Sequence, residues 1–299
     1  MPAAAGLRVL RGWRTARLRS TPLSAGGVRW KRRASTAAAA PLPVLARAAP
    51  HAERTAVVSE SGEYTYAELL ADSAHLSRTL RTAVREAAEP AALAEIMRSF
   101  AAGAPQDLDG ARVAFLCPPD AAYVVTLWAI WRAGGVTVPL CSAHPADELR
   151  YVLQDSGAEL LVLHPMYAET LLPLAASLEL PIVDYTEALR DAPPPAEGAA
   201  LAADPDDPPI DQDRRAHVVY TSGTTGRPKG VVHTHAAVAA QVSDLVDAWG
   251  WSAQDRILHF LPLHHTHGIV NKLCCPLSGA HGPRLQSDRC PCKLGCVSH

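Results

Sequence analysis

Residues 112–140, RVAFLCPPDAAYVVTLWAIWRAGGVTVPL, contain a strand pattern, a helix pattern and a second strand pattern in direct succession. The run RVAFLC (112–117) is short and apolar, as a buried strand is. Asp120 supplies a side-chain acceptor where the helical run begins, and the glycines at 134 and 135 end that run. The run VTVPL (136–140) returns to the strand pattern. This unit predicts two parallel strands joined by a crossover helix.

The same alternation extends on both sides of this unit. Helical stretches separate further apolar runs at TAVVS (55–59), LLVLH (160–164), PIVDY (181–185) and AHVVYTS (216–222). The pattern predicts an α/β fold of mostly parallel sheets covered by helices. Two segments interrupt it. Residues 87–109 indicate an inserted loop or an extra helix, and residues 191–213, with six prolines, seven acidic residues and no basic residue, predict an exposed linker or surface loop.

Composition and charge exclude several classes of protein. A chain that is 48% hydrophobic and 19% charged is neither disordered nor collagen-like. The longest apolar run, 121–131, is shorter than the roughly 20 residues that cross a bilayer, so we expect no membrane span. From Glu53 onward, 18 basic residues face 30 acidic ones. We therefore expect no nucleic-acid partner, because binding phosphate backbones needs clustered Lys and Arg.

The N-terminal segment is basic, whereas the rest of the chain is acidic. Glu53 is the first acidic residue, and ten basic residues precede it: Arg8, Arg11, Arg14, Arg17, Arg19, Arg29, Lys31, Arg32, Arg33 and Arg47. A segment rich in Arg, Ala, Ser and Leu without acids is typical of mitochondrial transit peptides. We expect residues 1–36 to direct the protein to the mitochondrial matrix. A disordered basic tail without an address is the alternative.

The stretch YTSGTTGRPKG (220–230) is the most informative motif for chemistry. Its glycines let the backbone approach an anion closely, its hydroxyls are donors, and its lysine adds a positive charge. The Walker A pattern does not fit these positions. An ordinary glycine-rich loop after a strand is the alternative. The predicted phosphate-binding residues are Thr221, Ser222, Gly223, Thr224, Thr225, Gly226, Arg227, Pro228 and Lys229.

This motif resembles the AMP-binding signature of the adenylate-forming superfamily, which contains acyl-CoA synthetases, luciferases and the adenylation domains of peptide synthetases. The resemblance covers roughly residues 50–277 and implies that the loop holds the β- and γ-phosphates of ATP, with Mg²⁺ as cofactor and CoA as co-substrate. The run LPLHHTHG (261–268) resembles the family motif that lines the acyl pocket. It implies the pocket residues His264, His265, His267 and Gly268.

The second motif favours a substrate with two polar ends. Fatty acyl-CoA synthetases commonly place an aromatic residue where this chain has His264. Imidazole groups can instead partner a second carboxylate. The run ILHFLPLHHTHGIVNKLCCPL is similar to malonate-activating acyl-CoA synthetases. The similarity implies that malonate or methylmalonate, ATP and CoA give a CoA thioester, AMP and diphosphate through an acyl-adenylate.

The resemblance also predicts an incomplete enzyme. The family adds a Glu for Mg²⁺, an Asp for the ribose hydroxyls and a Lys in a small C-terminal domain, and we find none of these motifs in the sequence. We therefore expect a partial N-terminal adenylation domain at 37–277, no complete catalytic set, and a chain that is incompetent alone. Residues 278–299 predict a divergent, disordered Cys-rich tail. A non-catalytic truncated isoform with at most weak nucleotide binding, or an unrelated NTPase, remains an alternative.

No metal-ligand set is predicted from the spacing of His and Cys residues. The group formed by His264, His265, His267, Cys274 and Cys275 matches no standard zinc pattern, and the spacing of Cys290, Cys292 and Cys296 is irregular. His259 alternates with apolar neighbours, which predicts a buried, hydrogen-bonded core residue.

Overall fold

The computed structural model describes residues 42–87, 107–194, 206–222, 226–252, 254–279 and 284–285. Several predictions concern segments outside these residues. They are the transit peptide, most of the insertion at 87–109, the middle of the acidic segment, residues 223–225 of the phosphate loop and most of the Cys-rich tail.

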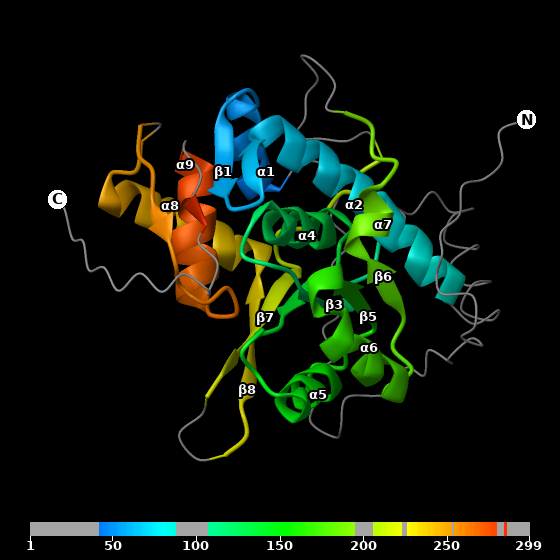
Figure 1. The fold of residues 1–299 in the computed structure, drawn as a ribbon. Helices are drawn as coiled ribbons and strands as arrows, with labels where there is room; N and C mark the ends of the chain where they lie inside the picture. The colour runs from blue at the N-terminus through cyan, green and yellow to red at the C-terminus, as the bar shows by residue number, and fades with distance from the viewer. Residues whose placement is uncertain are drawn as a thin grey trace, which may run out of the picture.

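A six-stranded sheet forms the centre of the molecule (Figure 1). Five strands are parallel, and the sixth, β8, is antiparallel to its neighbour β7. The predicted mostly parallel sheet is therefore confirmed. In spatial order the strands are β6 (Ile182–Asp184), β5 (Leu160–Leu163), β3 (Arg112–Leu116), β4 (Val136–Pro139), β7 (Arg215–Thr221) and β8 (Lys229–Thr234).

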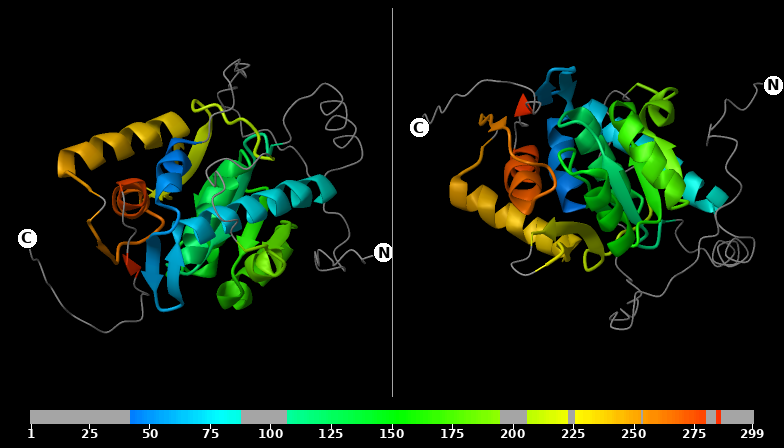
Figure 2. Two further views of the ribbon diagram at one scale, coloured as in Figure 1. Left: turned by 90° about the horizontal axis from the view of Figure 1, so that it is seen from above. Right: turned by 60° about the horizontal axis from the view of Figure 1, so that its bottom comes forward.

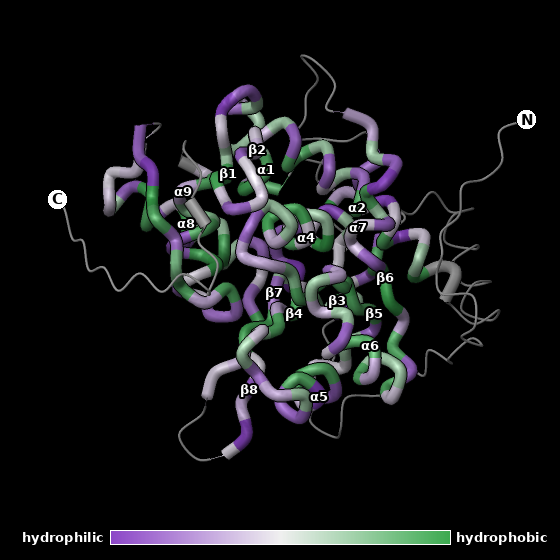
Figure 3. The backbone as a smooth tube through the Cα atoms, viewed as in Figure 1, coloured by the Kyte–Doolittle hydropathy of each residue, from purple (hydrophilic) through white to green (hydrophobic). Residues whose placement is uncertain are grey.

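Helices cover both faces of this sheet (Figure 1). Val113 and Phe115 of β3 pack in the same cluster as α4 (Ala121–Arg132) and α2 (Tyr66–Ala87). Their neighbours Ala114 and Leu116 point the other way and pack with α5 (Ala146–Asp155) and α6 (Ala168–Ser177). Because successive strand residues face opposite sides, a strand buried on both sides is apolar throughout. Figure 3 shows this hydrophobic colouring on the central strands.

Local sequence signals explain where the two helices on the α4 face begin. The Asp120 side chain accepts a hydrogen bond from the Ala122 amide at 2.8 Å, which confirms the predicted cap of α4. At the start of α2, the Thr65 amide donates to Glu68 at 2.7 Å and the Glu68 amide donates to Thr65 at 3.2 Å. This reciprocal pair is a capping box.

A second, four-stranded sheet lies beside the first. Its order is β2 (Gly62–Thr65), β1 (Thr55–Ser59), β10 (Arg284–Leu285) and β9 (Leu258–His259). β10 lies within the predicted tail 278–299, and its two residues pair in parallel with β1 and β9.

The remaining helices are short apart from α8. They are α1 (Pro43–Ala48), η1 (Ala49–His51), η2 (Pro165–Tyr167), α7 (Tyr185–Leu189), α8 (His235–Trp249), the π-helix η3 (His267–Cys274) and α9 (Cys275–Gly279). α8 and α9 lie toward one end of the molecule, and α2 extends toward the other (Figure 2). Within the described residues, no helix combines the length and the apolarity needed to span a membrane.

The described end of the acidic segment 191–213 keeps several exposed residues, and two of its residues are also held against helices. Nη2 of Arg132, on α4, lies 2.8 Å from Oδ2 of Asp207. Nη1 of Arg81, on α2, donates to the Asp206 carbonyl at 2.6 Å. An ion pair with Arg132 and a hydrogen bond from Arg81 hold this end of the segment, and local composition cannot show these long-range contacts.

Candidate functional site

The carboxyl ends of the parallel strands define the edge of the sheet where a site is expected. In open α/β sheets, ligands bind in the crevice outside these ends. The loop after β7 contains the predicted phosphate motif, and the loop after β4 contains Cys141 and His144. The topology therefore places the phosphate motif at the ligand-binding edge.

The phosphate motif forms the turn of the β7–β8 hairpin. Thr221 and Lys229 are partners across the two strands, and the Thr221 hydroxyl donates to the Lys229 carbonyl at 3.4 Å. Ser222, Arg227 and Lys229 are exposed. Gly226 has φ +158° and no atom within 4 Å of the place a Cβ would occupy. The described part of the loop thus presents a lysine, two hydroxyls and open backbone to the solvent.

Helix α5 holds the base of this hairpin. The Tyr151 hydroxyl donates to the Pro228 carbonyl at 2.8 Å, and the Arg227 guanidinium lies 5.3 Å from the centre of the Tyr151 ring. The Tyr220 hydroxyl donates to Asp155 at 2.8 Å. Burial and this hydrogen bond to a carboxylate raise the pKa of Tyr220, so the hydroxyl stays protonated and keeps its bond to α5.

Gly230 lets β8 lie close to β7. A Cβ at this position would come within 2.8 Å of Cγ1 of Val218 and 3.2 Å of the Tyr220 ring. The last glycine of the motif therefore has a packing role in the strand pair.

The predicted acyl-pocket motif leads into the π-helix η3. The Tyr123 hydroxyl of α4 donates to the Leu263 carbonyl at 2.6 Å and anchors this loop. The ring centroids of His264 and His265 are 4.1 Å apart, and the centroids of His264 and His144 are 5.4 Å apart. Burial and these two histidines lower the pKa of His264 to about 4. Its imidazole is therefore neutral at physiological pH.

His267 is oriented by a separate chain of hydrogen bonds. Nε2 of Gln241 donates to Oδ1 of Asn271 at 2.8 Å, so the Asn271 amide group is left to donate to Nδ1 of His267, at 3.2 Å. With Nδ1 as an acceptor, the proton of neutral His267 is on Nε2. The side chain thus has a donor available on its exposed side.

Gly268 is buried because the loop before it folds back over it. A Cβ at Gly268 would lie 2.2 Å from the Pro262 carbonyl oxygen. The Gly268 carbonyl lies 2.9 Å from Nε2 of His259, whose side chain is almost fully buried. The prediction that His259 is a hydrogen-bonded core residue is confirmed, and Gly268 has a structural role in the histidine loop.

The structure brings some predicted residues together and keeps others apart. His264 and His265 are in ring contact, whereas His267 begins the next helix. Among the described residues, no hydrogen bond, ion pair or ring contact joins the hairpin loop to the histidine loop. Gly223, Thr224 and Thr225 lie outside the described residues.

Sequence reasoning missed four residues beside these loops. Tyr151 and Asp155 support the hairpin, and no local signal marks them. Cys141 and His144 lie next to His264. Their Cys-x2-His spacing is by itself a weak indication of a metal site. It gains weight only because the fold brings His264 close to both residues.

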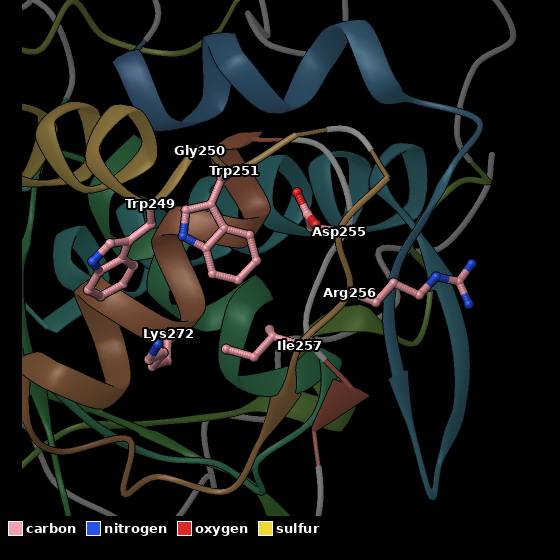
Figure 4. A pocket seen from close by; sticks show the side chains of 7 residues that line it. All are labelled: Trp249, Gly250, Trp251, Asp255, Arg256, Ile257 and Lys272. Atoms are coloured by element: carbon pink, nitrogen blue, oxygen red, sulfur yellow. The ribbon is translucent and has the colours of Figure 1, made fainter. Parts of the chain in front are cut away.

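A separate open pocket of about 320 Å³ lies between the end of α8 and the π-helix η3 (Figure 4). Trp249, Trp251, Ile257 and Lys272 are among its lining residues, and the Lys272 ammonium lies 4.3 Å from the centre of the Trp249 ring. None of the predicted phosphate-loop or acyl-pocket residues lines it.

Comparison with known proteins identifies the family of this fold. The profile of the family described as AMP-binding enzyme matches residues 91–282. The mitochondrial malonate–CoA ligase ACSF3 of Xenopus laevis is 41% identical over 237 residues, which cover 79% of this chain and 38% of the relative. Its Homo sapiens counterpart is 40% identical over 239 residues, covering 79% and 37%.

Solved structures give the same result. ATP-bound MatB from Rhodopseudomonas palustris has a TM-score of 0.62 and 25% identity, with 82% of this chain and 45% of that chain covered. The Bacillus subtilis o-succinylbenzoate CoA synthetase in complex with its acyl-adenylate has a TM-score of 0.61 at 23% identity, covering 83% and 56%, and shows the shared fold. The chain spans less than two fifths of the length of the ACSF3 relatives named above.

Proposed function

The chain belongs to the AMP-binding enzyme family, and from this we propose that it contributes the ATP-phosphate loop and part of the acyl pocket of a malonate–CoA ligase. The substrate is malonate or a related short dicarboxylate such as methylmalonate. The products are the CoA thioester, AMP and diphosphate, formed through an acyl-adenylate. The observation that carries the proposal is the position of the hairpin loop 221–229 at the carboxyl edge of the sheet.

The hairpin loop has the chemistry that a triphosphate needs. Lys229 is exposed at the end of the loop, Ser222 adds a hydroxyl, and the open backbone at Gly226 admits a bulky anion. In the proposed reaction these groups hold the β- and γ-phosphates while a substrate carboxylate attacks the α-phosphorus and diphosphate leaves. Mg²⁺ accompanies ATP, and no residue of this chain is assigned as its ligand.

The histidine loop supplies the groups proposed for the dicarboxylate. His265 and His267 are exposed, and Nε2 of His267 is a donor because Asn271 bonds its other nitrogen. We propose that these imidazoles donate to the carboxylate that does not react. Imidazole donors are effective partners for a second negative charge, which an alkyl chain lacks. The malonate–CoA ligase relatives support this substrate class.

The phosphate role is tested by Lys229→Ala in a chimeric ligase in which residues 42–277 replace the matched part of the Xenopus laevis relative. We expect kcat/KM for ATP to fall about 10- to 100-fold, because a charged hydrogen bond is worth about 1.5–3 kcal/mol. Arg190→Ala, which removes an exposed charge just after α7, is the control and leaves the kinetics unchanged. Unaltered ATP kinetics in Lys229→Ala would refute the role of Lys229.

The acyl role is tested in the same chimera by His265→Ala and His267→Ala. We expect KM for malonate to rise about tenfold, with KM for ATP unchanged, because the lost donors face the second carboxylate. Propionate is the control substrate because it lacks that carboxylate, so the variants lose their preference for malonate over propionate. Equal losses for malonate and ATP would indicate a packing role instead.

We also propose that the protein acts in the mitochondrial matrix. The ACSF3 relatives carry the word mitochondrial in their names, and residues 1–36 contain basic but no acidic residues. A fluorescent protein fused after residue 40 is expected in the matrix, and a cytosolic signal would contradict the proposal.

A further inference from the structure

Cys141, His144 and His264 bring three metal-ligand atoms together at the carboxyl edge of the sheet. One ligand atom from each residue lies within 4.8 Å of the other two. Two of the residues are on the loop after β4, and the third is on the loop before η3, more than a hundred residues later in the chain. Among the described residues, this is the one group of three or more His, Cys, Asp or Glu side chains with such spacing.

The loop after β4 is shaped to present two of these ligands. The His144 amide donates to the Cys141 carbonyl at 3.2 Å, and this bond closes a turn over the Cys-x2-His spacing. Cys141 follows the buried strand β4, and its thiol is buried. A short turn at the end of a strand holds both side chains close together, as zinc-binding turns with two residues between their two ligands do.

The third ligand is also held in place. The Tyr123 hydroxyl fixes the loop through the Leu263 carbonyl, next to His264.

A carboxylate completes the surroundings of the cluster. Oε2 of Glu148, one turn into α5, lies 3.6 Å from Nδ1 of His144. This separation is longer than a hydrogen bond, so a small side-chain movement would be needed to give the carboxylate–histidine–zinc arrangement in which the ring is oriented by the carboxylate.

We propose that Cys141, His144 and His264 form a site for a divalent transition metal of the zinc class, with water as the fourth ligand. One thiolate and two imidazoles suit Zn²⁺ and Co²⁺ and do not suit Mg²⁺ or Ca²⁺, which prefer oxygen ligands. When the metal binds, the S–H bond of Cys141 breaks, a sulfur–metal bond forms and the proton passes to the buffer. His264 also belongs to the predicted acyl pocket, but the test does not depend on the proposed function, because the bound metal itself is the readout.

The test uses Co²⁺ as a spectroscopic probe of the 299-residue chain. Cys290, Cys292 and Cys296 are first replaced by serine to remove competing thiols. We expect one Co²⁺ per chain with a thiolate-to-cobalt charge-transfer band, competed by Zn²⁺ and not by excess Mg²⁺. Cys141→Ser abolishes the band. His144→Gln and His264→Gln each weaken Co²⁺ binding by at least about tenfold, and Glu148→Gln weakens it by about tenfold.

His164→Gln is the matched control, because His164 follows the neighbouring strand β5 and lies outside the cluster. Its Co²⁺ affinity stays unchanged. Circular dichroism verifies the fold of each variant, and a Zn²⁺-dependent rise in Tm that is present in the parent and absent in the partly exposed His144→Gln gives a second readout. A folded parent that binds no Co²⁺, or a charge-transfer band that survives Cys141→Ser, overturns the proposal.

Discussion

Replacing Asp207 with asparagine is expected to lower the free energy of unfolding by about 3–5 kcal/mol. The Arg132 side chain is 1% exposed, and its Nη2 lies 2.8 Å from Oδ2 of Asp207. Its Nε and Nη1 have no hydrogen-bond acceptor among the described residues. Removing the carboxylate leaves a buried guanidinium without its counter-ion between α4 and the acidic segment, and that desolvation cost is large.

Urea denaturation of the 299-residue chain measures this change. Glu187→Gln is the control, because it breaks a pair with Arg190 in which both side chains are at least 40% exposed, and it should cost less than about 1 kcal/mol. Adding Arg132→Met to Asp207→Asn removes the buried charge as well and should recover most of the loss. If Asp207→Asn costs no more than Glu187→Gln, the segment is not anchored by this pair.

Replacing Gly268 with alanine is expected to cost about 3 kcal/mol of folding free energy. The new methyl group would lie 2.2 Å from the Pro262 carbonyl oxygen and 3.0 Å from its carbon. Both atoms belong to the backbone, so relief requires the whole histidine loop to move. The hydrogen bond between His259 and the Gly268 carbonyl would be strained by the same movement.

Gly250→Ala is the matched control for this substitution. Gly250 ends α8 with φ +63°, and nothing lies within 4 Å of its Cβ position. Alanine at position 250 would be strained only in its left-handed backbone conformation, which costs about 1 kcal/mol of folding free energy. Urea denaturation of both variants should rank Gly268→Ala as the more destabilised. The reverse order would mean that the loop yields easily and that its packing does not fix the histidines.

The sequence predicted most accurately the features that depend on interactions between residues close together in the chain. The strands β1, β3 to β7 and the capping role of Asp120 follow from apolar runs and a side-chain acceptor within a few residues. The phosphate role of the glycine-rich motif stays a prediction, because it concerns a ligand and not the fold. The mostly parallel sheet followed from the spacing of these elements.

Long-range contacts account for what sequence reasoning missed. Strand β8 is the edge strand of the sheet. Its neighbouring residues Val231 and Val232, which face opposite sides, are 42% and 51% exposed, so the sequence of β8 lacks the pattern of a buried strand. The docking of Asp207 depends on Arg132, which is far away in the chain. The approach of Cys141 to His264 likewise depends on how two distant loops meet. In each case the partner is set by the fold and not by neighbouring residues.

Product analysis of the chimeric ligase is the most direct test of the central claim, that the hairpin loop serves carboxylate adenylation. We expect AMP and diphosphate to form from ATP only when malonate is added, with CoA thioester appearing when CoA is present and with Lys229→Ala impaired. Formation of ADP and phosphate without any carboxylate, or AMP formation indifferent to malonate, would contradict it and favour an unrelated nucleotide hydrolase.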